Sequence, residues 1–286
     1  MRIGAIEAGG TKFVCGIGNE KGEIFEKVIY PTETPEITLK KVCNFFQNKK
    51  IDKLGVGAFG PIDLKPNSKT YGYIKKTPKL EWIDFDIIGY LEKELKIPIF
   101  FDTDVNAATL GEATWGIAKG IKNCVYITVG TGIGGGALVN GKLVHGMLHP
   151  EMGHIIIKRH PKDTYKGKCP FHSDCFEGLA SGPSLKERWG KEGKNISEEH
   201  IAWDIEAFYI AQGIVNFILT LSPEKIILGG GVMKQSQLFP KIRREVVLLL
   251  KDYLQTNEIL IDIDNYILAP KLGENAGLLG ALALTL

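Results

Sequence analysis

Two stretches of the chain, 2–30 and 124–146, have the same order of strands and turns. In each, a β-branched run leads into a glycine turn, a second apolar run, a turn signal and a third run. The turn signals are Asn-Glu-Lys-Gly at 19–22 and Asn-Gly at 140–141. A helical pattern and a further strand ending in glycine follow each copy, at 53–60 and 225–231. This repeat predicts a duplicated α/β chain with a cleft between its two copies.

Composition narrows the class of protein. A chain of 286 residues with 44% hydrophobic residues can bury one large core or two ordinary ones. Its apolar runs are shorter than the ~18 residues that a membrane span requires, and its start lacks the order of a signal peptide. A net charge of +2 gives no electrostatic reason to expect nucleic acid or a membrane as partner. We therefore expect a cytoplasmic protein with neither partner.

Glycine-rich loops end three of the expected strands. Only glycine lets backbone N–H groups approach a phosphate without a side chain in the way. Glycine also marks plain tight turns, but three loops at equivalent strand ends favour phosphate binding. The loops are Gly9, Gly10, Thr11 and Lys12, then Gly130, Thr131 and Gly132, and finally Gly229, Gly230 and Gly231.

The run Gly130 to Gly135 also satisfies the dinucleotide fingerprint G-x-G-x-x-G. That fingerprint requires a helix next, whose N-terminus holds the pyrophosphate. The sequence "ALVNGKLV" that follows has the pattern of a hairpin instead. The pattern therefore disfavours a Rossmann dehydrogenase, and no glycine loop leads into the Gly-Lys-Ser/Thr of a Walker A motif.

A carboxylate follows the apolar strand expected at 97–101. This strand runs into Asp102, Thr103 and Asp104, and "VNAATLGEA" then has the composition of a helix start. Asp104 is expected on the first helical turn, where it either caps the helix or accepts a proton from a substrate hydroxyl beside the phosphate loops. Asp102 is set aside.

The stretch "CPFHSDCFE" at 169–177 contains three residues of the types that bind zinc. Cys169, His172 and Cys175 suit a tetrahedral site, which needs a fourth ligand if it is closed. A redox pair would be expected as C-x-x-C, and these cysteines are six apart. The five cysteines in total are an odd number in a long chain, which disfavours a disulfide framework. A zinc site or a chance loop cluster remains.

Several motifs together resemble the ROK sugar kinases of the actin-like ATPase superfamily. They are, in order, "EAGGTK", "GAFGPID", "TDVNAA", "VGTGIGGG", "HPEMGH", "FEGLASGP", "LGGGV" and "GENAGLLGA". The resemblance implies two duplicated actin-like ATPase (ribonuclease H-like) domains with an interdomain cleft. We expect domains at 1–115, with the catalytic Asp, and at 116–286, with the zinc loop; the final helix is a candidate to pack back on the first. "EAGGTKF", "GAFGPID" and "HPEMGHI" resemble the bacterial fructokinase branch.

The resemblance also implies roles for particular residues. Asp104 matches the catalytic base, and Glu151, His154 and Glu177 match sugar ligands, with Gly60, Pro61 and Thr103 also on the sugar side. The loops at 9–12 and 130–132 match the phosphate loops, and that at 229–231 the adenosine side. His154 matches the zinc histidine, so the expected metal ligands are His154, Cys169, His172 and Cys175. The family run is C-x-C-G-x-x-G-C, one residue longer, and His172 stands in place of its middle cysteine.

Two departures bear on function. The family opens with Asp-x-Gly-Gly-Thr where this chain has Glu7, and its glucokinases place Asn where this chain has Thr103. The second departure weakens the case for glucose. The resemblance implies ATP-dependent phosphorylation of a hexose, foremost of D-fructose to fructose 6-phosphate, with Mg²⁺, a structural Zn²⁺ and a homodimer. The alternatives are a glucokinase, mannokinase or N-acetylhexosamine kinase, and a sugar-responsive repressor, which an N-terminal strand beginning near residue 3 disfavours.

Overall fold

The computed structural model describes residues 1–286, and its contacts group them into two compact units. Unit 1 comprises Met1–Gly120, Leu143–Pro150 and Lys271–Leu286, and unit 2 comprises Ile121–Lys142 and Glu151–Pro270. Both units are discontinuous in sequence, and the C-terminal segment groups with the N-terminal one. Each unit is described by itself below.

Unit 1 is built on a five-stranded mixed sheet in the order β3-β2-β1-β4-β7. β1, β2 and β3 form an antiparallel meander, whereas β4 and β7 run parallel to β1. This confirms the predicted order of three strands, a helix and a strand. The strands are β1 (Ile3–Ala8), β2 (Lys12–Gly18), β3 (Ile24–Pro31), β4 (Lys53–Ala58) and β7 (Ile99–Thr103).

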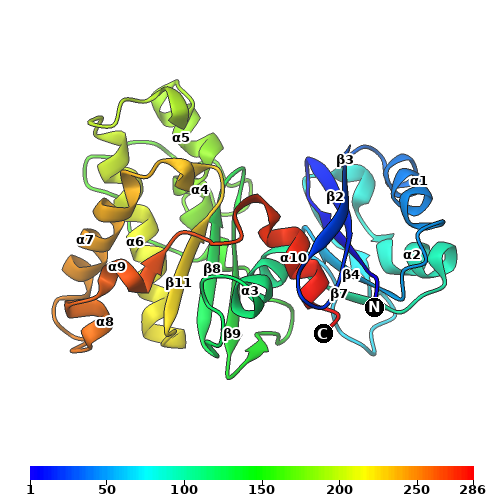
Figure 1. Ribbon diagram of the computed structural model, residues 1–286. Coiled ribbons are helices and arrows are strands. Elements are labelled where there is room, and N and C mark those ends of the chain that lie inside the picture. Colours follow the sequence, from blue (N-terminus) through cyan, green and yellow to red (C-terminus); the bar gives the residue numbers. More distant parts are fainter. The chain divides into compact units, whose positions relative to one another are not determined.

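Helices cover both faces of this sheet. Alternate residues of β1 point to opposite faces, so that Ile6 packs in one core cluster and Ile3 in another. The first cluster is covered by α1 (Pro35–Phe46) and α2 (Ile87–Leu95), and the second by α10 (Ala276–Ala283). α10 lies against α3 (Asp104–Thr114), and the two helices approach so closely that a Cβ at Gly280 would lie 2.0 Å from the carbonyl oxygen of Ala107 (Figure 1).

Unit 2 repeats the topology of unit 1, with the strand order β10-β9-β8-β11-β12. Its strands are β8 (Cys124–Val129), β9 (Ile133–Val139), β10 (Lys142–Leu143), β11 (Lys225–Gly229) and β12 (Ile267–Leu268). Asn140 and Gly141 have φ angles of 51° and 77°, as a two-residue hairpin turn requires. A strand and not a helix therefore follows the Gly130–Gly135 run, which confirms the hairpin prediction.

The helices of unit 2 include one long apolar helix, α6, which packs along α7. By length and composition α6 could cross a membrane, but 56% of its apolar window is buried inside the unit, as is typical of a core helix. The helices are α4 (Phe176–Ala180), α5 (Gly182–Trp189), α6 (Ala202–Leu221), α7 (Leu238–Leu250), α8 (Asn257–Leu260) and α9 (Ile263–Tyr266).

Candidate active site

Three parallel strands of unit 1 end side by side. Ala8 of β1, Ala58 of β4 and Thr103 of β7 are aligned across the sheet. The predicted residues Gly9, Gly60 and Asp104 follow these strands within one or two positions. Because ligands of α/β proteins bind beyond the carboxyl ends of parallel strands, this edge is the candidate sugar and phosphate side of unit 1.

The turn between β1 and β2 is tight and exposes its backbone. The amide of Gly9 donates to the carbonyl of Lys12 at 3.0 Å, and a Cβ at position 9 would lie 2.9 Å from that same oxygen. Thr32 donates its hydroxyl to the carbonyl of Gly9 at 2.7 Å, while Thr11 and Lys12 are exposed. With two glycines and an exposed lysine, the turn has the composition of an anion-binding loop.

Glu7 lies on β1 just before this turn. Burial raises the pKa of its carboxyl group, and the charges of Lys12 and Lys27 act against that rise. A Cβ at Gly277 of α10 would lie 2.4 Å from Cδ of Glu7. The extra methylene of Glu7 is therefore accommodated by a glycine on the helix that covers this face.

Asp104 begins α3, and its neighbour Thr103 is the cap. The hydroxyl of Thr103 accepts from the amide of Asn106 at 3.1 Å, which is the hydrogen bond of an N-cap. Oδ1 of Asp104 accepts from the amide of Val105 at 2.8 Å, and the residue is only partly buried. Capping therefore does not account for an aspartate at position 104.

Asp102 and His145 form a pair that the sequence did not indicate. Nε2 of His145 lies 2.8 Å from Oδ2 of Asp102. Oδ1 of Asp102 accepts from Nδ2 of Asn106 at 2.8 Å and from the amide of Thr103 at 2.7 Å. The two partners are 43 residues apart in the chain, so no local motif could have linked them.

The glycine loops of unit 2 also come together. The amide of Gly130 donates to the carbonyl of Gly132 at 2.8 Å, and a Cβ at Gly130 would lie 3.8 Å from the amide nitrogen of Gly231. Gly230 has a φ of 93°, and a side chain there would meet the carbonyl of Val129 at 2.4 Å. Two of the three predicted loops are thus adjacent at one end of the unit 2 sheet.

Two predicted sugar ligands lie close to this region. Glu177, in the first turn of α4, accepts from the amide of Ile133 at 2.9 Å, and a Cβ at Gly132 would lie 2.7 Å from its Oε2. The solvent-accessible area of Glu151 as a whole is that of an exposed residue. Desolvation of its carboxyl group, and then the charge of Glu177, nevertheless raise its pKa to about 7. Two carboxylates therefore share one site beside the Gly130–Gly132 loop.

Four side chains of unit 2 form a cluster suited to a metal ion. The donor atoms of His154, Cys169, His172 and Cys175 all lie within 4.8 Å of one another. Nδ1 of His154 lies 3.5 Å from Sγ of Cys175 and 3.7 Å from Sγ of Cys169, which is itself 3.7 Å from Nδ1 of His172. The four residues that the sequence predicted as ligands are thus brought together.

The spacing of these donors fits tetrahedral zinc. With Zn–S bonds of about 2.3 Å and Zn–N bonds of about 2.0–2.1 Å, the nitrogen and sulfur ligands are about 3.6 Å apart. The three separations above agree with that value. Because His154 turns Nδ1 toward the cluster, its Nε2 is left for another contact, such as a sugar hydroxyl.

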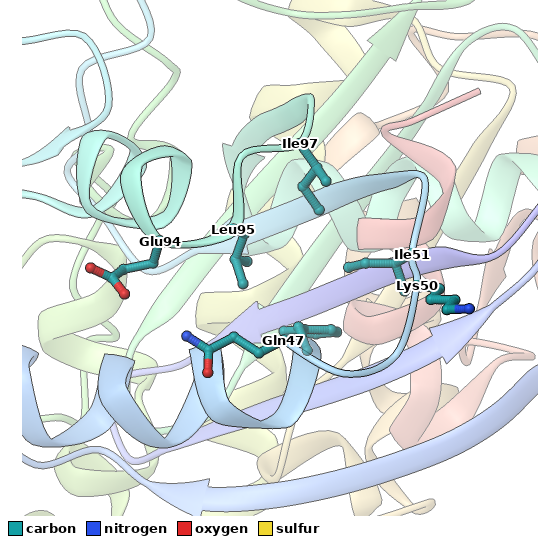
Figure 2. Close-up of a pocket in the computed structure, with 7 residues that line it drawn as sticks. Gln47, Lys50, Ile51, Glu94, Leu95 and Ile97 are labelled. Carbon is teal, nitrogen blue, oxygen red and sulfur yellow. The ribbon is translucent and has the colours of Figure 1, made fainter.

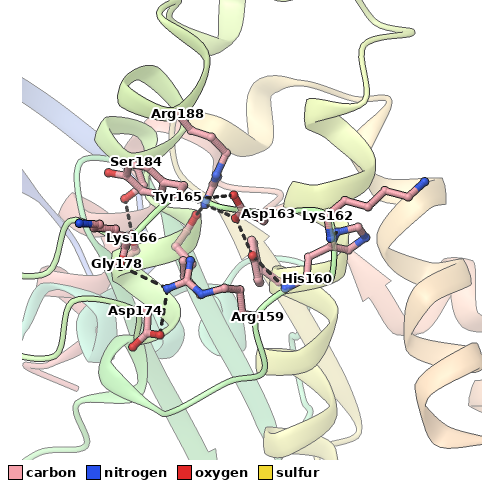
Figure 3. A network of polar contacts seen from close by, with 12 residues as sticks. Arg159, His160, Lys162, Asp163, Tyr165, Lys166, Asp174, Gly178, Ser184 and Arg188 are labelled. Carbon is pink, nitrogen blue, oxygen red and sulfur yellow. Dashed lines mark hydrogen bonds and ion pairs between the residues drawn. The ribbon is translucent and has the colours of Figure 1, made fainter.

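A buried polar network holds the irregular segment 156–175 against α5 and α6 (Figure 3). This segment carries three of the four ligands. Oδ2 of Asp163 accepts from the hydroxyl of Tyr209 at 2.6 Å and pairs with Nη2 of Arg188 at 3.1 Å. The side chains of Arg188 and Asp163 are only 5% and 3% exposed. Arg188 also donates to the carbonyl of Leu179 at 2.7 Å, at the end of α4. One arginine therefore joins the metal segment to the helix of Glu177.

Further contacts hold the same segment against α6. The side-chain amide of Gln212 accepts from the amide of Lys158 at 2.8 Å and donates to its carbonyl at 2.9 Å. Arg159 pairs with Asp174 at 3.0 Å. Glu206 of α6 is fully buried, and burial raises the pKa of its carboxyl group well above the usual value, with the nearby Arg188 opposing the rise. Burial therefore favours the neutral form of Glu206 beside the Arg188–Asp163 pair.

A small pocket of unit 1 is lined by residues other than the predicted site residues (Figure 2). Its volume is about 200 Å³, and it opens between the end of α1 and the end of α2. It is lined by Phe46, Gln47, Lys50, Ile51, Glu94, Leu95 and Ile97. None of these residues belongs to the strand-end loops, so the pocket has no part in the candidate site.

Comparison with known proteins agrees with the geometry. The model of the ROK family matches residues 3–286. A fructokinase of Lactococcus lactis subsp. cremoris is 47% identical over 274 residues, covering 95% of this chain and 92% of its own length. A fructokinase of Pediococcus pentosaceus is 45% identical over 284 residues, covering 99% of this chain and 97% of its own length.

A solved structure gives the same result for the fold. A ROK family glucokinase of Streptomyces griseus, in complex with glucose and AMPPNP, superimposes with a TM-score of 0.78 at 25% identity, covering 98% of both chains. The predicted fold, an α/β chain built from two related actin-like ATPase domains, is confirmed. Together with the strand-end loops of both sheets, these matches show that the chain belongs to the ROK family.

Proposed function

We propose that this chain is an ATP-dependent fructokinase that converts D-fructose to fructose 6-phosphate. The observation that carries the proposal is the identity of 45–47% with two proteins named fructokinase over nearly the whole chain. The two glycine-loop regions and Asp104, each at the carboxyl end of a parallel strand, supply what phosphoryl transfer needs.

In this proposal Asp104 is the general base. It would accept the proton of the sugar hydroxyl as that oxygen attacks the γ-phosphorus of ATP in line. Its place on the first turn of a well-packed helix fixes the carboxylate, which is the geometric requirement for such a base. Glu151, Glu177 and Nε2 of His154 would bind sugar hydroxyls, with Gly60, Pro61 and Thr103 on the sugar side.

The glycine loops would bind the nucleotide through amides other than those of Gly9 and Gly130, which donate within their own turns. Gly9, Gly10, Thr11 and Lys12 and the loop Gly130–Gly132 would take the phosphates, and Gly229–Gly231 the adenosine side. Mg²⁺ bound with ATP would neutralise charge on the phosphates. Glu7 offers the carboxylate oxygens that such a cation prefers.

We propose a structural zinc ion held by His154, Cys169, His172 and Cys175. The donor separations support it, and four protein ligands leave no open position for catalysis. The ion would fix the segment between Glu151 and Glu177, so that both carboxylates keep their positions. We further propose a cytoplasmic homodimer.

Glucokinase, mannokinase and N-acetylhexosamine kinase activities are the alternatives within the same machinery. Thr103 argues against glucose, because the glucokinases of the family place an asparagine there. In this chain the hydroxyl of Thr103 is already engaged as the cap of α3. A sugar-responsive repressor would retain sugar binding without phosphoryl transfer, which the fructokinase relatives disfavour.

A panel of sugars tests the proposal. The purified chain is assayed for ADP release with Mg²⁺-ATP and fructose, mannose, glucose or N-acetylmannosamine. We expect fructose to give the highest specificity constant and mannose the second. A clear preference for glucose or N-acetylmannosamine would refute the fructokinase assignment, and sugar binding without ADP release would favour the repressor.

A further inference from the structure

The segment 143–150 of unit 1 carries two histidines with opposite hydrogen-bonding roles. His145 faces a carboxylate, whereas His149 faces a backbone amide. Both lie against the strand-end edge that carries the proposed base. His149 opens the motif "HPEMGH", but the sequence assigned no role to either histidine. Their roles follow from what each ring nitrogen meets.

His149 acts as an acceptor. Its Nε2 accepts from the amide of Ile62 at 3.0 Å, so that nitrogen must carry a lone pair and the ring is neutral. The ring is buried, and burial lowers the pKa of His149. A Cβ at Gly60 would lie 3.3 Å from Cε1 of this ring. His149 therefore supports the loop after β4 as an uncharged group.

His145 acts as a donor. Nε2 of its ring lies 2.8 Å from Oδ2 of Asp102, a carboxylate oxygen that can only accept. The hydrogen bond with Asp102 raises the pKa of His145 above its usual value, with burial acting in the opposite direction. The side chain of His145 is 40% exposed, whereas that of Asp102 is only 6% exposed.

Asp102 also binds the first turn of α3. Its Oδ1 holds the amide of Thr103 and the side chain of Asn106, the residues immediately before and two after Asp104. Asn106 is 1% exposed and is also the residue whose amide Thr103 caps. The carboxylate of Asp102 thus joins His145, the cap residue and the buried amide around Asp104.

We propose that the His145–Asp102 pair positions Asp104: His145 donates to Asp102 and fixes it, and through it the first turn of α3. This inference rests on the proposed kinase function. His145 is a positioning residue, because it acts through Asp102. The charged and titratable groups around the pair are Asp102 of β7, His149 of the same segment and Tyr71, whose pKa is raised by burial and then by the charges of Glu92 and Asp102.

The pair also gives the reaction a pH dependence of defined sign. Because Asp102 raises the pKa of His145, the imidazolium persists to higher pH than a free histidine. Deprotonation leaves a neutral ring that can still donate to Asp102, but without the attraction between the imidazolium and the carboxylate. The rate should therefore fall as pH rises through the raised pKa, and Asp102→Asn should move this fall to lower pH.

The test combines kinetics with a readout that does not need activity. His145→Phe removes the donor, His145→Gln keeps one N–H for Asp102, and His200→Gln in unit 2 is the control. We expect His145→Phe to lower kcat for fructose up to about 100-fold with the KM for ATP unchanged, since small misplacements of a catalytic group have effects of this size. His145→Gln should restore most of the rate, and the control should match wild type.

In parallel, the ring of His145 is titrated by nuclear magnetic resonance in wild type and in Asp102→Asn. A pKa above the ordinary histidine value that drops in the variant supports the pair, and an ordinary value in wild type overturns it. An active enzyme whose kcat and pH profile are unchanged by His145→Phe also overturns the inference. A raised pKa in a chain that phosphorylates no sugar would instead refute the proposed function, and with it the positioning role.

Discussion

The two units have the same sheet order, but the polar groups of the candidate site are placed on them differently. In unit 1, β7 leads directly into α3, and Asp104 lies at that junction. Its counterpart β12 has two residues and is followed by Ala269 and Pro270. In unit 2 the candidate sugar and metal ligands lie instead between β10 and α6, in a segment that carries Glu151, Glu177 and the metal cluster, while the glycine loops follow β8 and β11.

The difference concerns how a side chain is held in place. Asp104 is positioned by neighbours in sequence and by a helix that packs tightly on its sheet. Segment 156–175 has almost no regular secondary structure, so its position depends on long-range contacts: the four metal-type ligands and the Asp163–Arg188 pair. Two sheets of the same topology can thus position one functional side chain through local structure and others through long-range contacts.

Removing the group held by local structure should have the largest effect on the reaction. We expect Asp104→Ala to lower kcat for fructose by about 10²–10⁴-fold, the usual effect of losing positioned proton transfer, with fructose affinity changed far less. Steady-state kinetics and calorimetric binding of fructose measure the two effects. Asp86→Ala is the matched control, since Asp86 caps α2 by accepting from the amide of Gly89. A variant at position 104 with near wild-type turnover would contradict the role of base.

Removing one ligand of the Cys/His cluster should abolish metal binding. We expect wild type to contain about one zinc ion per chain, as a four-ligand site would. Cys175→Ala should lose the metal and sugar binding while ATP binding persists, because the ligand set is broken. Elemental analysis and binding titrations measure this. Cys124→Ala, at a buried cysteine of β8, is the control. Zinc-free wild type with full activity would exclude a structural role for the metal.

Breaking the Asp163–Arg188 ion pair should affect stability and sugar binding together. Arg188→Met leaves Asp163 as an uncompensated buried charge, which typically costs about 3–5 kcal/mol. We expect a lower Tm and a higher KM for fructose, with the KM for ATP unchanged, since Arg188 also holds the end of α4. Lys168, in the same segment, forms an exposed ion pair with Glu187 of α5. Lys168→Gln should leave the Tm and the KM for fructose unchanged. Equal effects of the two variants would argue against a special role for Arg188.

The smallest effect is expected at the packing contact between Glu7 and Gly277. We expect Gly277→Ala to destabilise the fold by about 1–3 kcal/mol through overpacking. Glu7→Asp should relieve most of this loss, because a shorter side chain leaves room for the added methyl group. Chemical denaturation of the single and double variants gives the coupling between them. Additive effects would show that the contact is not the reason for the loss.

Features that depend on local sequence pattern could be predicted from the sequence. Strand order, the helix that begins at Asp104 and the triplet Cys169, His172 and Cys175 follow from glycine turns, periodicity and spacing. Contacts such as Asp102–His145 and Asp163–Arg188 join residues that are 43 and 25 positions apart. Such pairs leave no periodic signal, because only the folded chain brings their side chains together.

Phosphorus magnetic resonance of the purified chain with Mg²⁺-ATP and fructose tests the central claim most directly. The account predicts loss of the γ-phosphate signal of ATP, with equal amounts of ADP and of a sugar monoester identified as fructose 6-phosphate. Persistence of ATP, release of inorganic phosphate alone, or a phosphate ester at another position of the sugar would contradict it.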